Sequence, residues 1–160
     1  MGANKGVNSE ENKTAHAELV EAACATLDRS AMTFAETAYA AIMEAAARAA
    51  PNEACGILLG HGTRILTALP AANVHPEPLR HFEIDPAMLI AAHKAARAGG
   101  PAVLGYFHSH PNGVARPSAT DRASASGDGR VWAIAAAGEV SLWRDGPSGF
   151  EPLSYALDDG

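Results

Sequence analysis

The most constraining feature of the sequence is an apolar run that ends in two histidines. Val103 to Phe107 is continuously apolar and contains one glycine, as expected for a buried central strand. His108 and His110 follow it, and residues two apart on extended backbone point to the same side. Ser109, between them, points the opposite way and is interpreted as structural. The run therefore predicts a central strand that carries two neighbouring imidazoles at its end.

The segment after this strand offers a third metal ligand. Ser118 and Asp121 follow a proline-bounded loop, and the Asp121 carboxylate could join His108 and His110 around one ion. Three protein ligands with one open position are typical of a catalytic zinc site. Ser118 and Asp121 also spell the Ser-x-x-Asp capping box that starts many helices without a metal. The two interpretations are compatible, because a capped first turn would hold the carboxylate still.

Such a metal site would support hydrolysis. Two imidazoles and one carboxylate leave Zn²⁺ with net positive charge, which can lower the pKa of a bound water from about 15.7 to about 7. A hydrolase also needs a carboxylate outside the ligand set to take and return protons. Among the glutamates of the chain, Glu53 is better placed than most, because it stands at the start of a predicted buried strand.

The rest of the chain alternates between helix and strand patterns. Helices are predicted at 15–28, at 33–49 with Thr33 as its cap and Pro51 as its end, at 86–98 after Asp85-Pro86, and at 118–126. Strands are predicted at 53–60, 65–69, 81–84, 103–107, 131–136, 140–143 and 150–155. This order favours an α/β domain with a mixed sheet and helices on its faces.

Length and composition limit the domain organisation and the location. A chain of 160 residues suits one domain with a sizeable core. We expect residues 1–30 to form a partly disordered or helical extension and residues 31–157 to form the domain. No segment approaches the roughly 20 apolar residues of a membrane span. The acidic N-terminus lacks the apolar region of a secretory signal, so we expect a cytoplasmic protein without membrane contact.

Charge and cysteine content exclude further classes. A formal net charge of -6 argues against a nucleic-acid partner and favours a protein or small-molecule substrate. Cys24 and Cys55 are far apart and neither belongs to a CxxC pair, which argues against a disulfide framework or a cysteine-rich zinc site.

Together, Glu53, His108-Ser109-His110-Pro111, Ser118 and Asp121 resemble the motif of the JAMM (MPN+) zinc metalloproteases. The flanking segments 51–60, 81–86 and 117–121 are similar to the short prokaryotic members of that family, and the resemblance extends from about residue 34 to about residue 155. It implies a single JAMM/MPN domain with a curved mixed β-sheet flanked by helices, in a cytidine-deaminase-like layering.

The resemblance also implies an activity. It is that of a deubiquitinase-like isopeptidase, a zinc metallopeptidase that hydrolyses the amide bond after the C-terminal tail of a ubiquitin-like or sulfur-carrier protein. Zn²⁺ would be bound by His108, His110 and Asp121. Glu53 would act as general base and acid, and Ser118 would donate its hydroxyl to the oxyanion.

One departure from the eukaryotic deubiquitinases bears on the substrate. Only ten residues separate Asp121 from Trp132, which leaves no room for the long second insertion of those enzymes. A small prokaryotic modifier is therefore favoured over a particular ubiquitin chain.

Other functions fit the sequence less well. A non-catalytic MPN-type scaffold or interaction module is the main alternative, and the intact motif argues against it. A zinc deaminase would need H-x-E together with P-C-x-x-C, and the sequence contains no P-C-x-x-C. A DNA-associated branch of the fold is disfavoured by the acidic charge.

Overall fold

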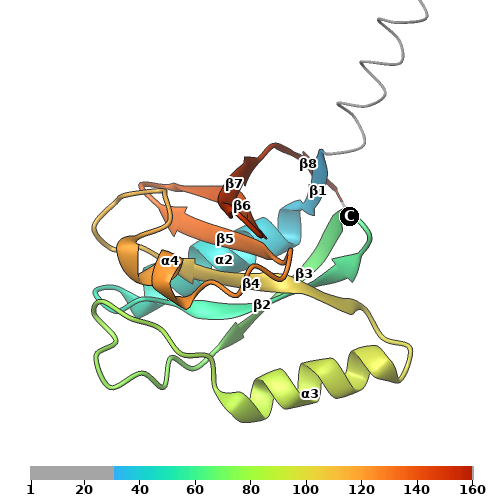
Figure 1. The fold of residues 1–160 in the computed structure, drawn as a ribbon, viewed down its shortest axis with the longest axis horizontal. Coiled ribbons are helices and arrows are strands. Elements are labelled where there is room, and N and C mark those ends of the chain that lie inside the picture. The colour runs from blue at the N-terminus through green and yellow to red at the C-terminus, as the bar shows by residue number, and fades with distance from the viewer. Residues whose placement is uncertain (1–30, 160) are drawn as a thin grey trace, which may run out of the picture. The chain divides into compact units, whose positions relative to one another are not determined.

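One strongly curved sheet organises residues 31–159, the part of the chain that the computed structural model describes (Figure 1). Its strands are β1 (Met32–Ala35), β2 (Cys55–His61), β3 (Arg64–Ala71), β4 (Ala102–Ser109), β5 (Val131–Ala136), β6 (Glu139–Gly146), β7 (Gly149–Leu153) and β8 (Tyr155–Asp158). The helices are α2 (Glu36–Ala49), α3 (Pro86–Arg97) and α4 (Ala119–Ser124).

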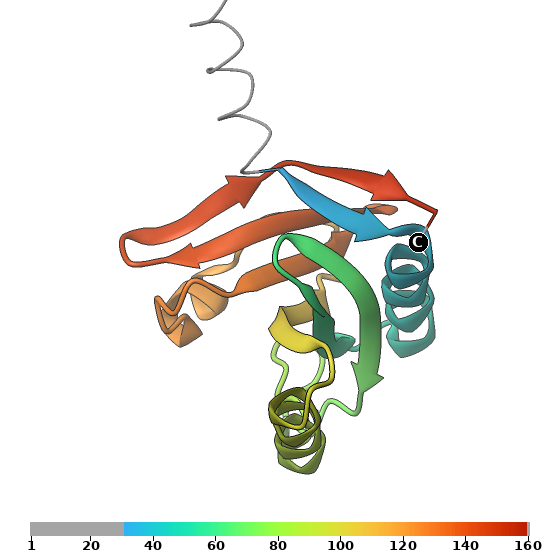
Figure 2. The same cartoon turned by 90° about the vertical axis from the view of Figure 1, so that its right-hand side faces the viewer.

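The strands pair in the order β7-β6-β5-β4-β2-β3-β1-β8. The β4–β5, β1–β3 and β1–β8 pairs are parallel and the others are antiparallel, so the sheet is mixed, as predicted. β7 and β8 follow each other in the chain but form opposite edges of the sheet. The sheet therefore curls until its two edges approach each other, which is visible in Figure 2.

Helices pack on both faces of this sheet. Alternation along β2 sends Leu58 into the larger core, which contains Ile42 of α2 and Phe107 of β4, all three with no exposed surface. Ile57 points to the other face, into a smaller cluster with Ala92 of α3. The end of β4 is therefore covered by protein on both sides, and side chains placed there are shielded from water.

Gly105 is required for the close pairing of β4 with β5. A Cβ atom at this position would lie 1.7 Å from the carbonyl oxygen of Val131, its register partner on β5. The glycine in the predicted central strand thus allows the approach that brings the ends of β4 and β5 together.

Several predicted elements are confirmed. The hairpin of β2 and β3, the central strand β4, and β5 lie where the pattern placed them. Asp85 caps α3 by accepting from the backbone N–H of Ala87 at 3.1 Å, and Pro86 occupies the first turn. Ser118 is the N-cap of α4, and both hydrogen bonds of the capping box are present.

Three predicted elements are wrong. Thr33 does not cap a helix, because residues 32–35 form β1 between β3 and β8, and α2 begins at Glu36. Residues 81–84 do not form a strand, because only Ile84 pairs with another segment, in an isolated bridge to Asn73. The last predicted strand is two strands, β7 and β8, separated at Ser154. Each error concerns a pairing between distant segments, which local patterns do not encode.

Two predictions concern the N-terminal part of the chain. The predicted helix at 15–28 lies outside the described residues, and the boundary between an extension and the domain near residue 30 stays a prediction. Within residues 31–159, none of the helices has both the length and the apolar character that a membrane crossing requires.

Candidate metal centre

Three buried side chains converge beyond the end of β4. His108 Nε2 lies 2.9 Å from His110 Nε2, and each of these atoms lies 3.1 Å from Asp121 Oδ2. The two histidines come from the end of β4 and the residue after it, whereas Asp121 comes from α4, which lies beside that end of the strand (Figure 1). The side chains predicted as ligands are therefore brought together from two elements.

This donor set fits a zinc ion. Zinc–nitrogen and zinc–oxygen bonds of about 2.0–2.2 Å in a tetrahedron put neighbouring ligand atoms about 3.3 Å apart, close to the spacing observed here. The three residues are between 0% and 6% exposed. Each offers one ligand atom, and these atoms all lie within 4.8 Å of one another.

Hydrogen bonding and packing orient the two imidazoles differently. His110 Nδ1 lies 2.7 Å from the carbonyl oxygen of Val114. A carbonyl only accepts, so Nδ1 carries the hydrogen and Nε2 keeps a lone pair for a metal. His108 Nδ1 is buried without a hydrogen-bond partner, and its ring stacks on Phe82 with centroids 4.4 Å apart. Burial lowers the pKa of His108, which favours the neutral form that binds metal.

One carboxylate oxygen of Asp121 contacts both the two histidines and the backbone at the start of α4. Its Oδ2 faces both histidines and also accepts from the backbone N–H of Ser118 at 2.8 Å. Burial alone would raise the pKa of Asp121, but its close contacts with the imidazoles of His108 and His110 hold it well below its usual range. The carboxylate is thus ionised and fixed by the helix cap.

Ser118 is compatible with both roles predicted for it. Its Oγ accepts from the backbone N–H of Asp121 at 3.0 Å, which is the capping bond. A hydroxyl that accepts one bond still has its hydrogen to donate. Ser118 is exposed, so this hydrogen is accessible to a bound substrate.

Glu53 lies close enough to His110 and Asp121 for their charges to affect it, and backbone contacts hold it in place. Its N–H donates to the carbonyl of Pro78 at 2.8 Å, and its carbonyl accepts from the Asn73 side chain at 3.0 Å. The pKa of Glu53 is raised from 4.5 to about 7, mainly by burial; the charge of His110 lowers it and the charge of Asp121 raises it by smaller amounts. A carboxyl that titrates near neutral pH is suited to take and return a proton.

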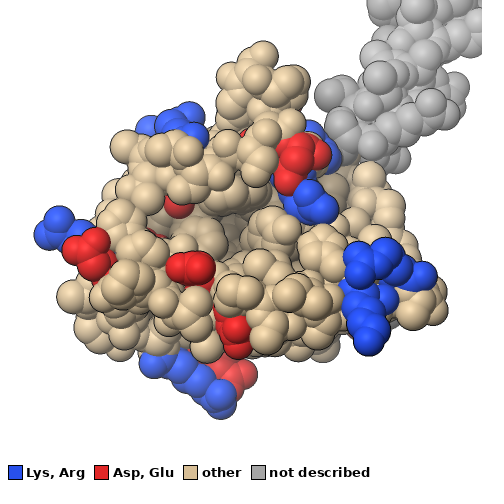
Figure 3. Space-filling view, turned by 60° about the horizontal axis from the view of Figure 1, so that its bottom comes forward, with Lys and Arg blue, Asp and Glu red and all other residues tan. Residues whose placement is uncertain are grey.

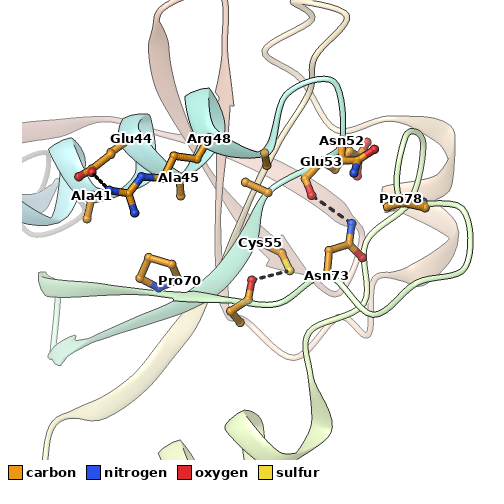
Figure 4. A pocket seen from close by; sticks show the side chains of 13 residues that line it. Ala41, Glu44, Ala45, Arg48, Asn52, Glu53, Cys55, Pro70, Asn73 and Pro78 are labelled. Atoms are coloured by element: carbon orange, nitrogen blue, oxygen red, sulfur yellow. Dashed lines mark hydrogen bonds and ion pairs between the residues drawn. The ribbon is translucent and has the colours of Figure 1, made fainter.

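Glu53 lines two clefts. The first, here called the aromatic cleft, has a volume of about 420 Å³ and runs from Glu53 and Asp121 past Phe82 and Trp132. The second, about 440 Å³, lies between α2 and the end of β3, with Asn73 and Pro78 at one end (Figure 4). Both are open to solvent, so the centre is reachable although its ligands are buried.

Sequence reasoning missed several contributors to this site. Phe82 was assigned to a strand, but it supports His108 and lines the aromatic cleft. Trp132 belongs to a predicted strand, and it also lines that cleft. Asn73 lies between two predicted strands, in a segment to which the sequence assigns no role, yet its amide binds the backbone of Glu53 and of His81. An asparagine in a proline-rich loop is a weak signal for such a role.

Cys55 is next to the site but is not an activated thiol. Its sulfur faces the carbonyls of Ala71 and Ala72 at 3.8 and 3.7 Å, as Figure 4 shows for the first of these. Burial, and then the charge of Glu53, raise the pKa of Cys55 to about 12. A nucleophilic cysteine needs a lowered pKa, so the geometry does not support cysteine chemistry.

Charged side chains are scattered over the face shown in Figure 3. That face is hollowed near its middle, acidic groups lie in and beside the hollow, and separate groups of basic side chains lie around its periphery, the largest of them at the right. On this face, therefore, no continuous basic stripe of the kind that follows a nucleic-acid backbone is visible.

Comparison with known proteins identifies relatives over most of the chain. The family described as prokaryotic homologs of the JAB domain matches residues 35–146. A Haloferax volcanii protein named desampylase is 36% identical over 118 residues, covering 72% of this chain and 85% of the relative. A Thermus thermophilus protein named probable TtuB-protein conjugate cleaving protease is 40% identical over 74 residues, covering 46% of this chain and 49% of the relative. Tail tip assembly protein K of Escherichia phage N15 is 33% identical over 113 residues, covering 71% of this chain and 44% of the relative.

Solved structures share the fold. The solution structure of a Desulfitobacterium hafniense protein has a TM-score of 0.70 at 29% identity and covers 81% of this chain and 94% of that one. The crystal structure of a JAB1/MPN domain protein from Archaeoglobus fulgidus has a TM-score of 0.52 at 20% identity and covers 79% and 98%. At 20% identity, the similarity to the Archaeoglobus fulgidus structure shows a shared fold and nothing more.

Proposed function

Because this chain belongs to the prokaryotic homologs of the JAB domain, the short prokaryotic type of the JAMM/MPN family, we propose that it is a zinc-dependent isopeptidase. The observation that carries the proposal is the convergence of His108, His110 and Asp121 beside a buried glutamate. The proposed bond is the amide after the C-terminal tail of a ubiquitin-like or sulfur-carrier protein.

Each residue has a role that its contacts support. His108, His110 and Asp121 would hold Zn²⁺, which when bound supplies a Lewis acid that polarises the scissile carbonyl and acidifies water. Glu53 accepts a proton from the attacking water and returns it to the leaving amine, so a carbon–oxygen bond forms as the carbon–nitrogen bond breaks. Ser118 donates its hydroxyl hydrogen to the charge that develops on the carbonyl oxygen.

The substrate class is proposed from the relatives and the site together. The chain spans 85% of the desampylase but only 49% of the TtuB-conjugate protease, so the activity suggested by their names is an inference for this chain. The aromatic cleft is open and ends at Glu53 and Asp121, which suits an extended peptide tail. A cytoplasmic location and the absence of nucleic-acid and membrane partners stay predictions.

The test uses the full chain and a defined substrate. The substrate would be TtuB, the protein named in the description of the Thermus thermophilus relative, joined through its C-terminus to the lysine side chain of a fluorescent peptide. It would be incubated with the full chain, with and without a chelator. We expect cleavage that the chelator abolishes and zinc restores. Cleavage that persists in the metal-free protein would contradict the zinc mechanism. Zinc binding without cleavage of this or related modifiers would favour the alternative, a non-catalytic scaffold.

A further inference from the structure

The last rung between β2 and β4 is irregular in a way that bears on Glu53. Cys55 pairs with His108 in this antiparallel ladder, so Ala54 lies opposite Ser109. A regular hydrogen-bonded pair exchanges two backbone N–H···O=C bonds. Here Ser109 N–H donates to the carbonyl of Ala54 at 3.0 Å, but Ala54 N–H donates to the side-chain Oγ of Ser109 at 2.7 Å. A hydroxyl thus replaces a main-chain carbonyl.

The chain leaves the ladder immediately after this rung. Glu53, the next residue, directs its N–H to the carbonyl of Pro78 rather than to β4. On the other strand, His110 N–H donates to the carbonyl of Ala135 on β5. The two hydrogen bonds between Ala54 and Ser109 are therefore the last direct connections between the segment that carries Glu53 and the strand that carries the histidines, and one of the two depends on the Ser109 side chain.

The position of Ser109 makes this connection short. It stands between His108 and His110 in the chain, and its partner Ala54 is bonded to Glu53. The serine is 4% exposed and Ala54 is 6% exposed, so water does not compete for the bond. Movement of Ala54 relative to Ser109 would move Glu53 relative to the ligands.

We propose that Ser109 is a positioning residue: its hydroxyl fixes the distance between the proton-shuttling Glu53 and the two histidine ligands. The expected loss of activity rests on the proposed function, whereas the coupling between the positions of Ser109 and Glu53 does not depend on it. A general base misplaced by about 1 Å can cost about 100-fold in rate. Ser109 is not among the three residues that could hold the metal, and its hydroxyl binds the N–H of Ala54, so its effect acts through Glu53.

Three variants separate positioning from a general structural role. Ser109→Ala removes the hydroxyl, and Ser109→Thr keeps it. Tyr155→Phe serves as a control, because it removes a different hydroxyl, one that donates to the carbonyl of Val140. Zinc affinity and stoichiometry, kcat and KM on the TtuB substrate, and hydrogen exchange of the Ala54 amide would be measured for each.

For Ser109→Ala we expect kcat to fall by about 30- to 100-fold, with KM and zinc affinity within about threefold of the parent. Ser109→Thr should restore kcat to within about fivefold, and Tyr155→Phe should leave it within about twofold. Exchange of the Ala54 amide should accelerate at least about tenfold in the alanine variant alone. An unchanged kcat in Ser109→Ala, or loss of zinc from it, would overturn the proposal.

A second measurement keeps this proposal separable from the proposed function. Glu53→Gln and Ser109→Ala would be combined, and the urea midpoints of the metal-free proteins compared at pH 8. If Ser109 holds Glu53 in its buried place, the midpoint gain from Glu53→Gln should fall by about half or more in the Ser109→Ala background. Coupling in a protein that cleaves nothing would support the positioning and refute only the isopeptidase activity, whereas additive effects would overturn the positioning.

Discussion

Replacing Glu53 with Gln should stabilise the metal-free protein above neutral pH while abolishing cleavage. Burial raises the pKa of Glu53 from 4.5 to about 7, so the folded state favours the protonated carboxyl. At about 1.36 kcal/mol per pH unit, the full penalty for ionising it is about 3 kcal/mol. Both clefts admit water to one side of Glu53, which reduces this penalty. We therefore expect Glu53→Gln to raise the free energy of unfolding by about 1 to 2 kcal/mol.

The pH dependence of this effect follows from the direction of the shift. A carboxyl whose pKa is raised on folding contributes stability below its unfolded value of 4.5, and that contribution is lost as the pH rises through about 7. Glutamine resembles the protonated carboxyl and does not ionise. The variant should therefore match the parent near pH 4 and exceed it at pH 8.

Urea unfolding with a chelator at several pH values would measure this difference. Glu151→Gln is a matched control, because Glu151 is exposed and its replacement should give no such gain. Added zinc should reduce the gain, since a nearby cation favours the ionised carboxylate. A gain that is the same at pH 4 and pH 8 would refute the desolvation argument, and loss of bound zinc from Glu53→Gln would mean that Glu53 is itself a ligand.

Three further changes test other parts of the site. Asp121→Ala should lower zinc affinity at least about 100-fold and abolish cleavage, and unchanged metal content in a titration would refute its assignment as a ligand. Cys55→Ala should keep zinc binding and kcat within about threefold, since its thiol has a raised pKa and faces backbone carbonyls; a large loss of kcat would indicate thiol chemistry. Asp145 is 1% exposed and its carboxylate accepts from the N–H groups of Ser126 and Gly127 just after α4. Asp145→Asn replaces one acceptor with a donor, so calorimetric titration should show zinc affinity about 10-fold weaker, and an unchanged affinity would mean that α4 does not depend on this anchor.

The candidate site was largely predictable because its signals are local. Two histidines two apart at the end of an apolar run, and a serine three residues before an aspartate, specify a strand end and a helix cap. Both features form as expected, and they bring His108, His110 and Asp121 together. The resemblance to a known motif then identified Glu53 as the general base. Its position in the sequence alone made it a better candidate than most of the other glutamates, but did not single it out.

The remaining parts of the fold depend on contacts between distant segments. Thr33 looks like a helix cap in isolation, but the pairing of β1 with β3 and β8 overrides that preference. The break at Ser154 sends β7 and β8 to opposite edges, and only the curl of the whole sheet explains it. Phe82 supports His108 from an irregular loop, and no periodicity marks such a contact.

Anomalous diffraction at the zinc absorption edge, from crystals of the full chain grown with zinc, would test the metal centre most directly. We expect one strong peak about 2 Å from His108 Nε2, His110 Nε2 and Asp121 Oδ2. The Glu53 carboxylate should lie outside bonding distance of that peak and face its open side. A peak at another place in the chain, or one bonded to Glu53 instead of a histidine, would contradict the proposed mechanism.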